Sequence, residues 1–494
     1  MRAFLGGRIF GAGPEATAVL VGDDGRIAAV GADEEIGSRV TKDTETVGLA
    51  GGLVVPGFQD AHVHLCQLGR ALARPDLGEA KDLGAALETA ARWRREKARG
   101  PLLLDGFDET RWPEKRTPHR NELDRIEPDR PLILRRVCCH VAIANTAALA
   151  RIPESAPNVD RATGRLEEDA AFRLETDYFP PGEEEDREAI RRAEAHAFSL
   201  GVTTVHEIDV PRVVPAYRAL EARGELRIRV FFFVCSRPGE AALLRDPEER
   251  GLFRVAGVKT FLDGSLGGAT AAMADPYEGG GRGTLLLGVP EIAKILREAE
   301  GLRIPSMMHA IGDRAIGAFL SAHEEVRSAG AMPLPHRVEH AEALDDAGAD
   351  RLAALGVRLS MQPNFPLRWG GSGGMYEARL GARRAAGLNR IGSWRRRGLP
   401  LAFGSDGMPF DPFYGIRGAV EHPVESERIS WEEALRLYTG SAESFVERGG
   451  EAGAIAPGKR ADFAVFDGAA GLTETLCKEN LRATVVGGEV VHER

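Results

Sequence analysis

The chain has 494 residues, of which 43% are hydrophobic and 28% charged, and its formal net charge is −10. This is the composition of an ordinary globular protein, and the basic residues form no long block, which argues against a nucleic-acid partner. No apolar run approaches the roughly 18 residues of a transmembrane helix, so we expect no membrane partner either.

The N-terminal stretch lacks a sustained apolar run with a cleavage site and is typical of mature protein. The five cysteines are few, odd in number and scattered: Cys66, Cys138, Cys139, Cys235 and Cys477. This usage predicts neither a disulfide framework nor a cysteine zinc site, and it favours the reducing cytoplasm. A homo-oligomer is compatible with the sequence.

Short apolar runs joined by turns fill residues 1–58 and return in residues 445–494. AVLVGDDGRIAAVG places an Asp-Asp-Gly turn between two such runs, and the C-terminal stretch carries Pro-Gly and Gly-Gly turns. We expect the two chain ends to form one small β-sandwich domain. Two unrelated edge hairpins are the alternative.

Between the ends, β-branched apolar runs alternate with longer Ala/Leu-rich charged stretches, which indicates βα units and a parallel sheet. Eight candidate strands occur in residues 59–444, the number that a closed (β/α)8 TIM-like barrel requires. They are FQDAHVH, GVTTVHEI, RIRVFFFV, VAGVKTFLD, IPSMMHAIG, HRVEHAE, VRLSMQP and LPLAFGSD.

About 135 residues separate the first two candidate strands, far more than one βα connection needs. The excess, residues 70–190, is predicted to be an insertion with its own helix and strand. Because it follows a barrel strand, it leaves the barrel at the C-terminal face, where active sites lie. We therefore expect it to act as a lid or as one wall of the pocket.

The first strand carries His62 and His64, whose side chains face the same side of a strand and could bind one metal ion. A lone His-x-His pair is weak evidence. However, Lys259, His309, His340 and Asp406 also lie near the ends of apolar strands. Barrel strands bring such residues to one site, and six of them are hard to explain by core packing.

The sequence resembles the amidohydrolase superfamily over nearly its whole length. The similarity rests on the His-x-His, Lys, His, His and Asp pattern of strands one, four, five, six and eight, and on GGLVVPGFQDAHVH and GAIAPGKRADFAVFD. KTFLDGS, HAIGDRAI and FGSDGMP resemble a narrower branch that includes N-substituted formamide deformylases.

The resemblance implies that His62, His64 and Asp406 bind one divalent metal ion, and that His309 and His340 bind a second. Lys259, carboxylated on its amine, would bridge the two ions, since an unmodified ammonium has only donors. A single metal ion beside an unmodified Lys259 is the alternative. Imidazole and carboxylate ligands favour zinc and leave manganese or iron open.

The implied activity is hydrolysis of an amide-like C–N bond of a small molecule by a metal-activated hydroxide, with Asp406 as the proton shuttle. Amides, formamides, carbamates and cyclic amides all suit this chemistry. Deamination, isomerisation or ester hydrolysis on the same scaffold stays open. A non-catalytic relative is disfavoured because all six ligand positions match.

Other polar residues are weaker candidates for substrate binding, each with a structural alternative. His206 ends the second strand and could equally be a core histidine, and Asp263 could cap a turn. His140 and Asn145, in the insertion, resemble a stretch of the branch. Asp313, which follows His309, could form hydrogen bonds with neighbouring residues. The remaining candidates follow the seventh strand, where loop polarity is the alternative: Gln362, Arg368 and Trp369.

Overall fold

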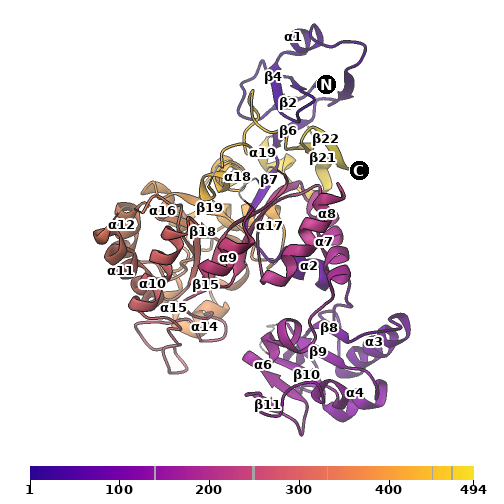
Figure 1. Ribbon diagram of the computed structural model, residues 1–494, viewed down its shortest axis with the longest axis vertical. Helices are drawn as coiled ribbons and strands as arrows, with labels where there is room; N and C mark the ends of the chain where they lie inside the picture. Colours follow the sequence, from indigo (N-terminus) through magenta and orange to yellow (C-terminus); the bar gives the residue numbers. More distant parts are fainter. Residues whose placement is uncertain (138–140, 247–250, 331, 448, 469–470) are drawn as a thin grey trace. The chain divides into compact units, whose positions relative to one another are not determined.

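The computed structural model describes residues 1–137, 141–246, 251–330, 332–447, 449–468 and 471–494. The chain forms two compact units (Figure 1). The first, here called the barrel unit, contains Met1–Leu65 and Ala193–Arg494. The second, the inserted unit, contains Cys66–Arg192. In the described part of the chain, no helix combines the length and the apolar character needed to span a membrane.

An eight-stranded parallel sheet is the centre of the barrel unit, and its strands neighbour one another in chain order. The strands are nearly continuous buried runs, as expected of a parallel sheet covered on both faces. They are β7 (Phe58–Val63), β13 (Val202–Asp209), β14 (Arg229–Cys235), β15 (Phe253–Phe261), β16 (Ser306–Ala310), β17 (Arg337–His340), β18 (Arg358–Met361) and β19 (Leu401–Phe403).

The sheet closes where the chain after β19 meets β7. The Asp406 amide donates to the His62 carbonyl at 2.7 Å, and the Ser405 amide donates to the Asp60 carboxylate at 2.9 Å. Gly404 makes this approach possible, because a Cβ there would lie 2.4 Å from the His62 nitrogen. The predicted (β/α)8 barrel is therefore confirmed.

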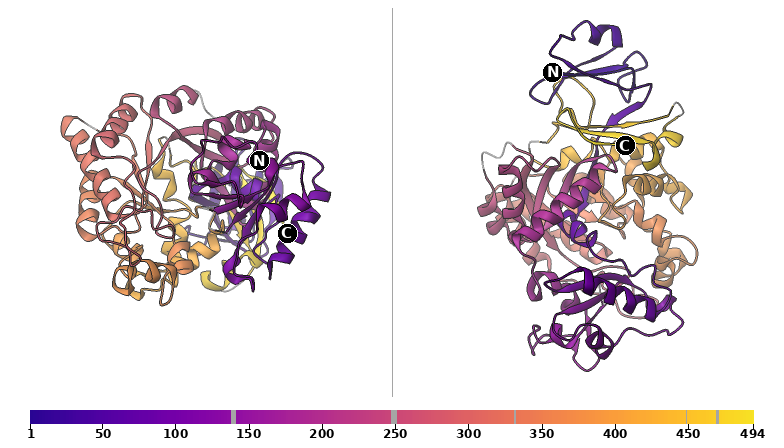
Figure 2. Two further views of the ribbon diagram at one scale, coloured as in Figure 1. Left: turned by 90° about the horizontal axis from the view of Figure 1, so that it is seen from below. Right: turned by 90° about the vertical axis from the view of Figure 1, so that its right-hand side faces the viewer.

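Helices connect the strands and cover the outside of the sheet (Figure 2). The longest, α11, buries an apolar face, and α12 ends at Gly356, whose φ of +69° gives a left-handed cap. The barrel helices are α8 (Val214–Ala222), α9 (Pro238–Leu244), α10 (Val289–Gly301), α11 (Asp313–Ala329), α12 (Asp346–Leu355), α13 (Asn364–Trp369), α14 (Met375–Leu380), α15 (Ala382–Ala385), α16 (Ile391–Arg396), α17 (Pro412–Val420) and α18 (Trp431–Leu437).

Both chain ends build a β-sandwich, as predicted (Figures 1 and 2). Its two sheets share one apolar core, in which the rings of Phe4 and Phe463 meet edge to face at 4.9 Å. One sheet has β1 (Arg2–Leu5), β3 (Ala18–Val21), β4 (Ile27–Gly31) and β5 (Glu45–Gly48); the other has β2 (Arg8–Ile9), β6 (Leu53–Pro56), β20 (Phe463–Phe466), β21 (Leu481–Val486) and β22 (Glu489–Glu493). Helices α1 (Asp33–Gly37) and α19 (Leu472–Thr475) accompany them.

The inserted unit has a five-stranded mixed sheet with an apolar core on each face. Its strands are β8 (Leu102–Phe107), β9 (Leu132–Arg136), β10 (Val141–Ala144), β11 (Val159–Asp160) and β12 (Arg165–Glu167). Helices α2 (Leu65–Ala71), α3 (Leu83–Glu96), α4 (Arg120–Ile126), α5 (Thr146–Leu149), α6 (Asp169–Phe172) and α7 (Glu183–Phe198) complete this part of the chain. It is thus a folded unit with its own core rather than an extended loop.

Candidate metal centre

The six predicted ligands lie at the C-terminal ends of barrel strands. His62 lies in β7 and His64 directly after it, whereas Lys259, His309 and His340 lie in β15, β16 and β17. Asp406 is three residues beyond the end of β19 rather than in the strand. The end of each strand thus contributes at most two ligands, and the closed sheet brings them together.

Three of these residues form a cluster that could hold a metal ion. One ligand atom each from His62, His64 and Asp406 lies within 4.8 Å of the others. Asp406 Oδ1 is 3.6 Å from His62 Nε2 and 3.4 Å from His64 Nε2. These separations are longer than the donor–acceptor distance of a strong hydrogen bond, and they suit ligand atoms placed around a common ion.

Each histidine of this cluster has its other ring nitrogen engaged. His62 Nδ1 contacts the Glu339 carboxylate, and His64 Nδ1 lies 2.8 Å from the Ile208 carbonyl oxygen. Such partners hold the ring and leave Nε2 as the ligand atom, an arrangement typical of metal-binding histidines.

The histidines of the second predicted pair are held in the same way. His340 Nδ1 is 2.7 Å from Gln362 Oε1, and His309 Nε2 is 3.0 Å from the Gly264 carbonyl oxygen. The two rings are 4.6 Å apart, and the His340 ring is 4.7 Å from that of His62. All four rings therefore belong to one cluster.

Burial keeps several of these imidazoles neutral. It lowers the pKa of His62 and His340 well below the usual value, with the Lys259 charge as a further cause, and it lowers that of His309 to about 4. A neutral imidazole is the form that binds a metal ion.

Lys259 is the least satisfied polar group of the cluster. Its side chain is 2% exposed, and its Nζ has no hydrogen-bond partner among the described residues. Burial lowers its pKa to about 8. A buried amine without a partner costs free energy, so this position fits a group that is modified or shared with an ion.

A buried ionic chain lies behind His62 and was not predicted from the sequence. The Arg337 guanidinium lies 2.7 Å from Glu339 Oε1 and donates to His206 Nδ1 at 2.7 Å and to the Ala61 carbonyl at 2.6 Å. Arg337, Glu339 and His206 are all fully buried. His206 is a candidate from the sequence, whereas the only sequence signal for Arg337 and Glu339 is a pair of charges in the buried strand RVEH.

The structure gives three of the weaker candidates structural contacts. His206 lies against the rings of Phe231 and Phe233 and accepts from Arg337. Asp263 accepts from three backbone amides, those of Ala272, Ile311 and Gly312. Asn145 caps α5, and its amide group makes four contacts with backbone atoms, which leaves none for a substrate.

Of the other candidates, one contacts the centre, two are half-buried outside it and one is exposed. Gln362 belongs to the centre through His340. Asp313 accepts from the backbone amides of Ala274 and Arg314 at the start of α11. Trp369 packs against Phe365 with ring centroids 4.7 Å apart, while the Arg368 side chain is exposed. His140 lies outside the described residues.

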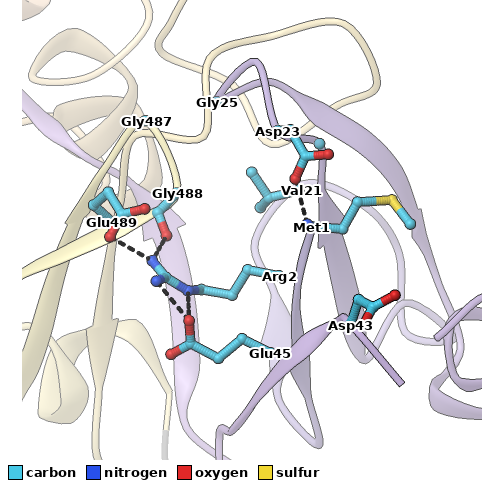
Figure 3. A pocket seen from close by; sticks show the side chains of 11 residues that line it. Met1, Arg2, Val21, Asp23, Gly25, Asp43, Glu45, Gly487, Gly488 and Glu489 are labelled. Carbon is cyan, nitrogen blue, oxygen red and sulfur yellow. Dashed lines mark hydrogen bonds and ion pairs between the residues drawn. The ribbon is translucent and has the colours of Figure 1, made fainter. Parts of the chain in front are cut away.

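A separate hollow of about 280 Å³ lies in the β-sandwich (Figure 3). Arg2 lies on its wall and forms ion pairs with Glu45 at 2.7 Å and with Glu489 at 3.1 Å. The N-terminal amine forms an ion pair with Asp23. Most of its charged groups pair with one another, and no barrel strand lines it. It therefore has no part in the metal centre.

Comparisons with known proteins agree with this geometry. The model of the amidohydrolase family matches residues 45–492. The chain is 28% identical to the putative amidohydrolase YtcJ of Bacillus subtilis, covering 98% of this chain and 97% of the relative. It is also 28% identical to the N-substituted formamide deformylase of Arthrobacter pascens, covering 92% of this chain and 90% of that protein.

Two solved structures are similar over nearly their whole length. An uncharacterized metal-dependent hydrolase from Pyrococcus furiosus is 30% identical with a TM-score of 0.81, covering 94% of this chain and 99% of its own. One from Pyrococcus horikoshii is 27% identical with a TM-score of 0.83, covering 99% of this chain and 100% of its own.

Proposed function

The chain belongs to the amidohydrolase family, and from this premise we propose that it hydrolyses an amide-like carbon–nitrogen bond of a small molecule with the help of one or two divalent metal ions. The observation that carries the proposal is the orientation of the four histidines. Each has one ring nitrogen engaged by a carboxylate, a carbonyl or an amide. The other nitrogen of each is left for an ion.

We assign His62, His64 and Asp406 to one metal ion, and His309 and His340 to a second. Zinc suits these ligands best. A divalent ion would lower the pKa of water towards 7 and polarise the substrate carbonyl. Lys259 would bridge the ions as a carbamate: its neutral amine adds to carbon dioxide and releases a proton. The buried Nζ, which has no hydrogen-bond partner in the described part of the chain and a lowered pKa, supports this assignment.

Asp406 is the residue to which we assign proton transfer. Its side chain is 13% exposed, so it lies at the boundary between the buried ligands and the solvent. It would take the proton of the attacking water and return it to the departing amine. A positioned carboxylate of this kind contributes roughly 10²- to 10⁴-fold in rate.

The class of bond is supported by the family and by one relative. The name of the Arthrobacter pascens protein specifies N-substituted formamides, so formamides are the first substrates to test. Simple amides, carbamates and cyclic amides follow from the same chemistry.

The test combines metal analysis with a substrate panel. The purified protein should hold one to two equivalents of divalent metal, and chelation should abolish hydrolysis of formamides or amides until zinc or manganese is returned. Full activity of metal-free protein would refute the mechanism. Ammonia release from aminopurines or aminopyrimidines alone would show a deaminase instead.

A further inference from the structure

Phe261 is an exposed aromatic side chain at the predicted metal centre. It ends β15, two residues after Lys259, so the two side chains point to the same side of the strand. Its exposed fraction is 41%, whereas that of Lys259 is 2%. Among the aromatic side chains that the structure describes, Phe261 is the only exposed one.

The ring of Phe261 contacts two predicted ligands. Phe261 is the register partner of His309 on β16, and their ring centroids are 5.3 Å apart. Lys259 Nζ is 5.1 Å from the centroid of the Phe261 ring. The ring thus adjoins two of the predicted ligands while part of its surface stays open to solvent.

Leaving a large apolar ring in water costs free energy that burial would recover. A single exposed apolar side chain needs no explanation on an ordinary surface. At this site, however, the exposed ring adjoins the groups that would carry the chemistry. A bound molecule that covers the ring would therefore recover that free energy at the reacting centre.

We propose that Phe261 is a specificity-determining residue that binds a flat apolar group of the substrate, such as an aryl substituent next to the scissile bond. The inference rests on the proposed function, because it places the scissile bond at the ligands beside the ring. Aromatic groups pair favourably with such a ring, edge to face or stacked. A cationic group is disfavoured because the same centre would hold metal ions.

Two small chelators provide the probes for a binding experiment. Benzohydroxamic acid and acetohydroxamic acid share the metal-binding group and differ only in phenyl against methyl. Their dissociation constants should be measured on zinc-loaded protein by calorimetry, with metal content determined for every variant. Phe261→Ala should weaken benzohydroxamate roughly 2- to 10-fold and leave acetohydroxamate unchanged.

Two further variants isolate the ring. Phe261→Leu keeps an apolar side chain without the ring and should weaken benzohydroxamate only partly. Leu243→Ala is the matched control, because Leu243 is an apolar side chain on α9 that is 88% exposed. It should change neither dissociation constant.

The outcomes separate this inference from the proposed function. If zinc-loaded protein binds neither hydroxamate, the metal centre itself is wrong and the inference falls with it. If both bind, but Phe261→Ala affects them equally or not at all, the metal centre stands and the role of Phe261 is refuted. Cyclohexanecarbohydroxamic acid has an apolar ring that is not flat. If Phe261→Ala weakens its binding as much as that of benzohydroxamic acid, the preference for a flat group is wrong.

Discussion

Asp406 has a backbone conformation that non-glycine residues rarely adopt, with a φ of +53°. Such a residue stores roughly 1–3 kcal/mol of strain and persists only where its surroundings hold it. Here its amide bonds to the His62 carbonyl, and the Asn364 side chain holds the Ser405 and Met408 carbonyls on either side. In this conformation the Asp406 carboxylate lies 3.4 Å from His64 Nε2 and 3.6 Å from His62 Nε2.

Asp406→Asn should separate metal binding from proton transfer. The amide keeps the shape and one ligating oxygen but cannot accept the proton. We expect at least one metal ion to remain bound while turnover falls by roughly 10²- to 10⁴-fold. The readouts are turnover number, metal content and unfolding temperature.

Asp411→Asn is the matched control. Asp411 lies in the same loop and caps α17 by accepting from the Phe413 and Tyr414 amides, a role that asparagine can fill. Its turnover should be unchanged. If Asp406→Asn also kept near-normal turnover and lost only thermal stability, Asp406 would be a structural residue and the mechanism would be wrong.

Glu339 is a positioning residue, which contacts His62 on the ring nitrogen that is not the predicted ligand atom. Its charge favours an oriented and more basic imidazole, and Arg337 compensates that charge in the buried interior. Glu339→Gln should therefore weaken zinc binding about 10- to 100-fold, measured by competition with a chromophoric chelator. It should also lower stability, because Arg337 is left buried without its counter-charge.

The double variant Arg337→Met/Glu339→Gln distinguishes these effects. Removing both charges should restore much of the stability of the metal-free protein, since no buried charge is then uncompensated. Zinc affinity should stay low. An affinity close to that of the native chain in both variants would show that Glu339 does not act on the metal centre.

At the scale of single elements, β17 shows how a strand can aim two successive side chains at one site. Regular alternation would turn Glu339 and His340 to opposite sides. His340 has a φ of +68° and Ala341 one of +46°, so the alternation breaks at the strand end. As a result, both residues reach His62: Glu339 contacts its Nδ1, and the His340 ring packs against its ring.

The sheet of the inserted unit is held by an ionic network as well as by its two cores. Glu175 pairs with Arg74, with Arg135 at 3.2 Å and with Arg70 at 3.4 Å. Burial raises the pKa of Glu175. The charge of Arg74 and the hydrogen bond from Arg74 lower that pKa by more, so it lies well below the usual value of about 4.5.

This shift makes the stability of the inserted unit depend on pH. Because the pKa of Glu175 is lower in the folded state, its contribution is present above about pH 4.5 and is lost as the pH falls below it, with a slope of up to about 1.4 kcal/mol per pH unit. Glu175→Gln should therefore increase hydrogen exchange in β8 and β9 at pH 6.5. The difference from the native chain should shrink towards pH 3.

Glu167→Gln provides the control for this prediction. Glu167 pairs with Arg165 in the same unit, but its side chain is 50% exposed, and exposed ion pairs contribute little. Its exchange should match that of the native chain at every pH. If β8 and β9 were equally protected from hydrogen exchange in the native chain and in the Glu175→Gln variant at pH 6.5, the role assigned to Glu175 would be wrong.

At the scale of the whole molecule, the predicted ligands all belong to the barrel unit. Metal binding to the folded barrel should therefore stabilise that unit by mass action, by about 2.7 kcal/mol when free metal is 100-fold above its dissociation constant. The inserted unit contains none of the six residues and should gain nothing directly.

Calorimetry with and without a chelator, combined with hydrogen exchange, tests this difference. Chelation should lower the unfolding temperature of the barrel unit and increase exchange in β7, β16 and β17. Exchange in β8 and β9 of the inserted unit should stay the same. Equal changes in both units, or none in either, would refute a metal centre confined to the barrel.

The barrel and the sandwich follow from local sequence features, and the same features carry the prediction of the metal ligands. Eight apolar runs of strand length specify the sheet because each must bury both faces. The residues near the ends of these runs are costly to bury without a partner. That is why six ligands could be proposed from the chain alone: His62, His64, Lys259, His309, His340 and Asp406.

The tertiary structure decided the features that depend on contacts between strands distant in sequence. The pairing of Glu339 with His62 and Arg337, the left-handed backbone at His340 and Asp406, and the exposure of Phe261 all arise where closure of the sheet brings strand ends together. Asn145 shows the reverse: a residue that matches a family stretch is committed to capping α5. Local patterns report which side chains are hard to bury, but only the closed barrel determines which partners they meet.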